Sequence, residues 1–114
     1  MWDFEIMDGI NFKFSNHVHP LMQKRVQNLL QNLSNDMNVK KIVLFGSSLE
    51  FRCNSNSDID LYVEKEDVEV PLSANLDIDC EVDIVTNLDK DSNLYKEIMR
   101  KGLLLFERKN LCVM

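Results

Sequence analysis

The stretch LFGSSLEFRCNSNSDIDLYV, residues 44–63, decides the fold of this 114-residue chain. It begins inside an apolar, β-branched run, residues 40–45, which has the composition of a buried strand and stops at Gly46. Gly-Ser-Ser then favours a tight turn into a short helix over residues 48–52, and turn-forming residues follow. Residues 58–63 alternate between polar and apolar side chains, as a half-buried strand does. The stretch therefore predicts two strands joined by a glycine turn, a helical turn and a loop.

Hydrophobic periodicity predicts a long helix before this stretch. Apolar side chains recur three and four residues apart over residues 18–37 and build one stripe, made of Met22, Val26, Leu29, Leu30, Leu33 and Met37. Ser15 or Asn16 can cap the start of this helix, and Pro20 suits its first turn. Ahead of it, we expect residues 1–16 to form an arm or an edge strand.

The rest of the chain predicts two more strands and one more helix. Residues 81–86 and 103–106 have strand patterns, and a helix that starts at Asp91 or Ser92 ends at Gly102. Its expected buried side is Leu94, Ile98 and Met99. The order of elements predicts an α/β (α+β) fold in which helices flank one mixed sheet.

Composition limits the classes of function. Apolar residues make up 45% of the chain and charged residues 28%, which is typical of a soluble globular protein, and we expect one domain over residues 1–114 with its core in residues 17–108. The net charge is −6, and residues 58–91 hold 12 acidic residues against Lys65 and Lys90. This acidic centre argues against binding of duplex nucleic acid, which needs a basic surface, but it suits phosphate approached through divalent cations.

Nothing in the sequence predicts export or a membrane span. No apolar run approaches the length of a membrane-spanning helix, and residues 1–10 lack the basic start of a secretory signal. The cysteines are odd in number and widely spaced, so we interpret Cys53, Cys80 and Cys112 as reduced thiols. We therefore expect a cytoplasmic protein.

Three acidic residues on predicted strands are candidates for metal binding. Asp58 and Asp60 project from the same face of their strand, where two carboxylates repel each other unless a cation lies between them. Asp83 stands alone in an otherwise apolar strand, Val82-Asp83-Ile84-Val85. The alternative is that these carboxylates are solvated, at a strand edge for the pair and at a strand end for Asp83.

Gly46 and Ser47 are candidates for phosphate contact. Glycine allows a sharp turn and a close approach to a ligand, and the following amides and hydroxyl can donate to phosphate oxygens. Other features carry weaker signals. The pair His17 and His19 is expected to be structural, and a basic C-terminal group is expected to be mainly a solvated face, with triphosphate or partner contact as the minority reading: Lys96, Arg100, Lys101, Arg108 and Lys109. Asp77 and Asp79 compete with Asp83 for the role of third carboxylate, and Asp83 is preferred because its neighbours are apolar.

Taken together, these residues resemble the polymerase-β-like nucleotidyltransferases. Gly46-Ser47, ten intervening residues and Asp58-Ile59-Asp60 match the G-S-x10-D-x-D signature of that superfamily. The strand EVDIV, residues 81–85, is similar to the strand that carries the third carboxylate, and IMRKGLLLFER, residues 98–108, is similar to the closing helix and strand. The resemblance covers residues 20–108 and is strongest to the minimal nucleotidyltransferases, which include antitoxins to HEPN-type toxins.

The resemblance implies a role for each matched residue. Asp58, Asp60 and Asp83 would be the catalytic carboxylates and would coordinate two Mg²⁺ ions, with Asp83 also helping to deprotonate the attacking hydroxyl. Gly46 and Ser47 would hold the β- and γ-phosphates of ATP, the expected substrate, assisted by Ser48 and Arg52. The implied activity is Mg²⁺-dependent transfer of AMP to a hydroxyl of a partner protein, a HEPN-type toxin.

Three residues depart from the family pattern and leave alternatives open. Ser48 and Glu50 stand where many minimal members carry arginine, and Phe51 stands where a second glycine is common. One alternative is therefore a catalytically weak or inactive antitoxin that acts by forming a complex. Another is a transferase that modifies a small molecule and works as a homodimer.

Overall fold

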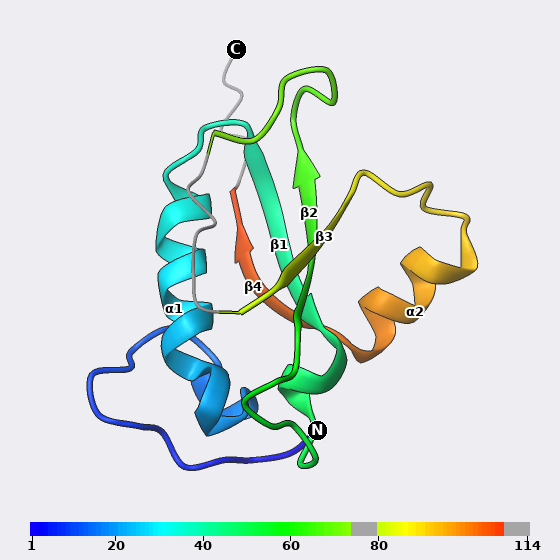
Figure 1. The fold of residues 1–114 in the computed structure, drawn as a ribbon. Coiled ribbons are helices and arrows are strands. Elements are labelled where there is room, and N and C mark those ends of the chain that lie inside the picture. Colours follow the sequence, from blue (N-terminus) through cyan, green and yellow to red (C-terminus); the bar gives the residue numbers. More distant parts are fainter. Residues whose placement is uncertain (74–79, 109–114) are drawn as a thin grey trace.

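One mixed sheet organises the residues that the computed structural model describes, 1–73 and 80–108. Its strands are β1 (Val39–Phe45), β2 (Ile59–Lys65), β3 (Val82–Thr86) and β4 (Leu103–Glu107), in the spatial order β3-β2-β1-β4. The central strand β1 pairs antiparallel with both β2 and β4, whereas β2 and β3 run parallel (Figure 1). The predicted fold class, an α+β fold with a mixed sheet, is confirmed.

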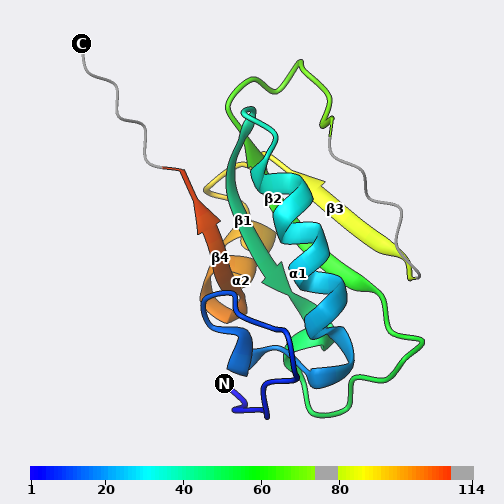
Figure 2. The same cartoon turned by 90° about the vertical axis from the view of Figure 1, so that its left-hand side faces the viewer.

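The two α-helices lie on opposite faces of this sheet (Figures 1 and 2). Helix α1 (Pro20–Ser34) contributes four of its predicted stripe residues to the larger core: Met22, Val26, Leu29 and Leu33. Helix α2 (Asn93–Lys101) covers a smaller cluster formed by Val43, Tyr62 and Ile98. Neither of these helices, the two α-helices in the described ranges, is long and apolar enough to cross a membrane.

Both helices differ in detail from the prediction. Helix α1 ends at Ser34, because the Asp36 carboxylate accepts a hydrogen bond from the Asn38 amide (2.9 Å) and starts a turn there. Met37 therefore falls outside the helix and is 75% exposed. In α2 the expected buried residue Leu94 is 51% exposed, and Tyr95 packs instead against Tyr62 with ring centroids 5.7 Å apart.

The N-terminal residues form an arm and not an edge strand. Residues 1–14 contain no strand, and a 3₁₀ helix, η1 (Ser15–His17), connects them to α1. Two buried glutamines of α1 hold the arm through its backbone. Gln23 bonds Met7 N (2.8 Å) and Glu5 O (2.8 Å), and Gln27 bonds Asn11 N (2.9 Å) and Gly9 O (3.0 Å). The arm thus satisfies polar groups inside α1 that would otherwise be costly to bury.

Arg108 has a structural role that the sequence did not reveal. Its guanidinium donates to the carbonyl oxygens of Val39 (3.1 Å), Ser34 (3.0 Å) and Asp36 (3.3 Å). These bonds tie the residue after β4 to the end of α1 and the start of β1. Arg108 therefore does not belong to a solvated basic face.

The apolar stripe of α1 gives a stability prediction with an internal control. Leu33 is fully buried between α1 and the sheet. We expect Leu33→Ala to lower the free energy of unfolding by about 2–5 kcal/mol, because it leaves a cavity in the larger core. Met37→Ala, at an exposed position of the same predicted stripe, should change it by less than about 0.5 kcal/mol. Urea denaturation followed by circular dichroism measures both, and equal losses would contradict the observed end of α1.

Candidate active site

The glycine turn after β1 is in direct contact with a candidate carboxylate. Gly46 has φ +84°, a left-handed conformation that side chains rarely adopt. A Cβ added at Gly46 would collide with Oδ2 of Asp60 and lie 3.2 Å from its Cγ. Asp60 is also the pairing partner of Phe45 across β1 and β2. The turn therefore requires glycine for two reasons, its backbone conformation and the space that Asp60 occupies.

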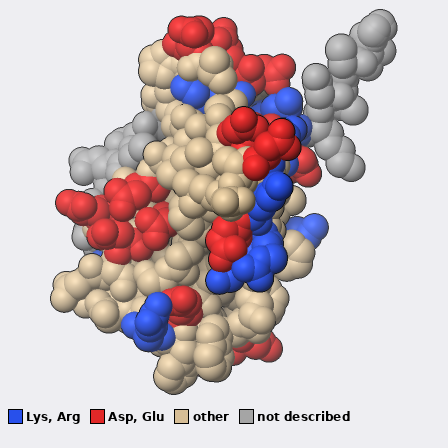
Figure 3. Space-filling view, turned by 90° about the vertical axis from the view of Figure 1, so that its right-hand side faces the viewer, with Lys and Arg blue, Asp and Glu red and all other residues tan. Residues whose placement is uncertain are grey.

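The structure brings the three candidate carboxylates to one region of the sheet. Asp60 and Asp83 are paired in the parallel register of β2 and β3, and Asp58 lies one residue before β2. Asp60 is half-buried, whereas Asp58 and Asp83 are exposed. In the view of the face covered by α2, acidic side chains gather in a patch at the β3 side of the molecule (Figure 3).

The electrostatics of Asp60 reflect this arrangement. Burial raises the pKa of Asp60 above its ordinary value of 3.8, and repulsion from Asp83 and then Asp58 raises it further. Asp83 therefore interacts with Asp60 although it comes from a separate segment of the chain. Asp60 is the member whose charge is the most costly to hold in the absence of a cation.

These residues fit a divalent cation that keeps other ligands. Within residues 1–73 and 80–108, no three or more His, Cys, Asp and Glu side chains form a group that could by itself hold a metal ion. Mg²⁺ in nucleotide sites commonly takes one or two carboxylates, with waters and substrate phosphates completing its coordination. Carboxylate oxygens are its preferred protein ligands, and a cation would relieve the repulsion at Asp60. Asp58, Asp60 and Asp83 could therefore hold a cation in an open site.

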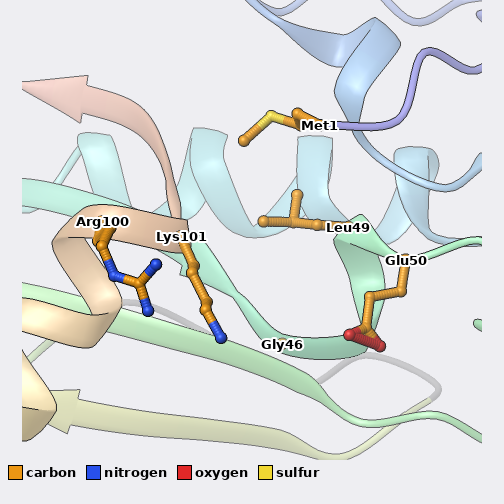
Figure 4. Close-up of a pocket in the computed structure, with 6 residues that line it drawn as sticks. All are labelled: Met1, Gly46, Leu49, Glu50, Arg100 and Lys101. Atoms are coloured by element: carbon orange, nitrogen blue, oxygen red, sulfur yellow. The ribbon is translucent and has the colours of Figure 1, made fainter.

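A pocket of about 500 Å³ lies beside the glycine turn. It is lined by Met1, Gly46, Leu49, Glu50, Arg100 and Lys101. Figure 4 shows the Lys101 side chain extending toward Gly46 across this pocket, which we call the Gly46 pocket. The side chains of Arg100 and Lys101 also form ion pairs with Glu97, at 2.8 Å and 2.7 Å respectively.

Arg100 and Lys101 are the site residues that sequence reasoning undervalued. Their position follows from Gly102, where a Cβ would lie 2.6 Å from Cγ1 of Val43 and 3.1 Å from the Leu44 carbonyl oxygen. Only glycine lets the end of α2 approach β1 this closely. The available signal was two bases in the last turn of a helix that ends at glycine, next to a strand that leads into Gly46.

Other predicted site residues occupy different surroundings. Ser47 is half-buried in the 3₁₀ helix η2 (Gly46–Leu49), which replaces the helix expected over residues 48–52. Ser48 is fully buried, and its hydroxyl has no hydrogen-bond partner among the described residues. Arg52 pairs with Glu50 (2.9 Å) and does not line the Gly46 pocket. The expected phosphate contacts from Ser48 and Arg52 are therefore not supported by their positions.

The histidine pair is structural, as predicted. His19 caps α1 by accepting from the Leu21 amide (3.2 Å), and the ring of His17 bonds the Trp2 carbonyl oxygen (2.9 Å). The competing candidates Asp77 and Asp79 lie outside the described residues, as do Lys109 and Cys112. Cys53 is buried in the larger core.

Because the pKa of Asp60 is raised, we expect that replacing Asp60 by a neutral residue stabilises the fold in a pH-dependent way. Between pH 3.8 and the raised pKa, the folded state binds more protons than the unfolded state, so stability falls as the pH rises through this window. Above this pH window the loss of stability has reached its full size. We expect Asp60→Asn to melt at a higher temperature than the natural chain at pH 7 in EDTA. The difference should shrink as the pH falls through this window and disappear below 3.8, where the carboxyl group is protonated in both the folded and the unfolded state.

The control for this measurement is Asp8→Asn, which removes the same charge from an exposed position on the arm. Thermal melts of the three proteins over a pH series test the prediction. A gain of Asp60→Asn that does not change with pH would contradict the assignment of the effect to ionisation of Asp60.

Comparison with known proteins agrees with this geometry. Residues 27–111 match the family described as Polymerase beta, Nucleotidyltransferase. No curated protein matches the chain. The match covers most of the chain and includes the glycine turn, all three candidate carboxylates, and Arg100 and Lys101 of the Gly46 pocket. The chain belongs to the polymerase beta nucleotidyltransferase family.

Proposed function

We propose that this protein transfers a nucleoside monophosphate, AMP from ATP, to a hydroxyl group of a partner protein. The observation that carries the proposal is the contact between the Gly46 turn and Asp60, which is itself in register with Asp83. This contact places the candidate phosphate-binding turn next to the candidate metal ligands. Members of the family typically use a nucleoside triphosphate with a divalent metal, which is the chemistry that such an arrangement suits.

Each residue of the candidate site has a role in an in-line displacement at the α-phosphorus. Gly46 and Ser47 hold the terminal phosphates, and Lys101 and Arg100 neutralise them across the Gly46 pocket. Asp83 accepts the proton of the acceptor hydroxyl, whose oxygen forms a bond to the α-phosphorus while the bond to the β-phosphate oxygen breaks and pyrophosphate leaves. Asp58, Asp60 and Asp83 would hold Mg²⁺, for which we propose two ions, and the bound cation would supply Lewis-acid stabilisation of the charge on the reacting oxygens.

The proposed acceptor is a HEPN-type toxin, which the resemblance to minimal nucleotidyltransferases suggests. Incubation of the purified chain with Mg²⁺, ATP labelled at the α-phosphate and the HEPN-type partner should transfer label to the partner. Asp58→Ala should abolish the transfer, and Asp8→Asn should not. No label on the partner, with Asp58→Ala and the natural chain behaving alike, would overturn the proposal.

A second candidate function is neutralisation of the partner by binding alone. The observation that favours it is Glu50, an acidic residue that lines the Gly46 pocket where many minimal members carry a base. The double variant Asp58→Asn/Asp60→Asn separates the two functions in a toxin-neutralisation assay. A transferase should lose neutralisation, whereas a binding antitoxin should keep it.

A further inference from the structure

Two large aromatic side chains are in contact with each other and remain open to solvent. The rings of Trp2 and Phe51 have centroids 5.4 Å apart and an interplanar angle of 37°. Trp2 is 55% exposed and Phe51 is 70% exposed. Aromatic residues usually bury most of their surface, so an exposed pair marks a surface that is suited to binding.

The backbone next to both rings is hydrogen-bonded. On the arm, the Trp2 carbonyl oxygen bonds the His17 ring (2.9 Å), and the Phe4 amide donates to Asn16 O (2.7 Å). Next to Phe51, the Glu50 amide donates to Ser47 O (2.9 Å), which closes η2. A ligand that stacks here therefore meets a backbone that is already ordered on both sides, which lowers the entropy cost of binding.

The aromatic pair borders a mostly apolar pocket, which suits the flat face of a nucleobase. This pocket measures about 280 Å³ and is lined by Trp2, Glu50, Phe51 and Arg52. Glu50 and Arg52, which also line this pocket, form an ion pair with each other (2.9 Å). Planar bases stack on aromatic rings and on guanidinium groups, whereas their edges require hydrogen bonds.

This pocket is adjacent to the Gly46 pocket. Glu50 lines both, and consecutive arm residues line one each, Met1 the Gly46 pocket and Trp2 the other. Gly46 begins η2 and Glu50 directly follows it, so the two residues lie roughly 8 Å apart at the rise of a 3₁₀ helix. A single nucleotide can therefore reach from one pocket into the other.

We propose that Trp2 and Phe51 form a stacking site for the base of the nucleoside triphosphate whose phosphates occupy the Gly46 pocket. This inference rests on the proposed function and adds to it the location of the base and the part of the arm that binds it. The arm is then part of the substrate site and not only a cover for α1. A purine such as adenine offers the largest ring face for this contact.

The test uses the fact that Trp2 is the one tryptophan of the chain, so intrinsic fluorescence reports this ring alone. With Mg²⁺ present, ATP should quench the fluorescence in a saturable way. Inorganic tripolyphosphate should bind, as measured by calorimetry, without quenching. Phe51→Ala should weaken ATP binding about tenfold and leave tripolyphosphate binding unchanged. Phe51→Tyr, which keeps the ring, should bind ATP as the natural chain does.

The matched control is Phe14→Ala, which removes an exposed aromatic ring of the arm that lines neither pocket. Equal ATP affinity of Phe51→Ala and the natural chain would overturn the stacking site and leave the proposed function intact. Quenching by a short oligoadenylate and not by ATP would also overturn it, because the base would then belong to an acceptor strand. If neither ATP nor tripolyphosphate binds, the proposed function fails together with this inference.

Discussion

Asp60→Asn is expected to reduce nucleotidyl transfer by about 1000-fold or more in kcat/KM. Asp60 contacts the Gly46 turn and is also paired with Asp83, so it joins the proposed phosphate site to the proposed metal site. An amide at this position keeps the shape of the side chain but removes the negative charge that attracts a divalent cation. Pyrophosphate release from ATP with Mg²⁺ and the acceptor measures the loss.

The control for this variant uses its expected gain in stability. An enzyme that loses activity because it unfolds should melt earlier, whereas Asp60→Asn should melt later in EDTA, because it removes a charge that burial and two neighbouring carboxylates disfavour. Asp8→Asn should keep both the activity and the melting temperature of the natural chain. If Asp60→Asn retained more than about a tenth of the activity, Asp60 would not be a metal ligand.

The opposition between activity and stability explains why the sequence revealed this region. Two carboxylates on one strand face, Asp58 and Asp60, repel each other, and Asp83 stands alone in an apolar strand. Such departures from a favourable local pattern are expected at functional sites. The alternation of β2 was sufficient to place Asp58 and Asp60 on one face. It could not show that Gly46 lies against Asp60, because that contact depends on the pairing of β1 with β2.

Tertiary packing decided the features that were predicted incorrectly or incompletely. Tyr62 shares a strand face with Asp58 and Asp60 and yet is 1% exposed, because α2 covers this face of the sheet next to it. Periodicity alone extended α1 to Met37, since it does not detect the turn that Asp36 forms. The sequence pattern of Arg100 and Lys101 is that of a solvated face. In the structure they line the Gly46 pocket, because Gly102 lets the end of α2 approach β1 closely.

Gly46→Ala is expected to be the second most damaging substitution for activity, and its cause can be separated into two parts. The alanine backbone must adopt φ +84°, which costs about 1–2 kcal/mol for a residue that has a side chain. It must also displace the Asp60 carboxylate, because the new Cβ would collide with Oδ2. A shift of about 1 Å in a reacting group commonly costs about 100-fold in rate, and we expect a loss of at least that size.

Gly9→Ala supplies the matched control, because Gly9 has nearly the same backbone conformation, φ +82°, with nothing within 4 Å of an added Cβ. It should therefore show the conformational cost in a denaturation curve and retain full transfer activity. The difference in activity between the two variants measures the contact with Asp60 by itself. If both variants lost stability equally and both kept their activity, the close approach of Gly46 to Asp60 would have no part in positioning the catalytic carboxylate.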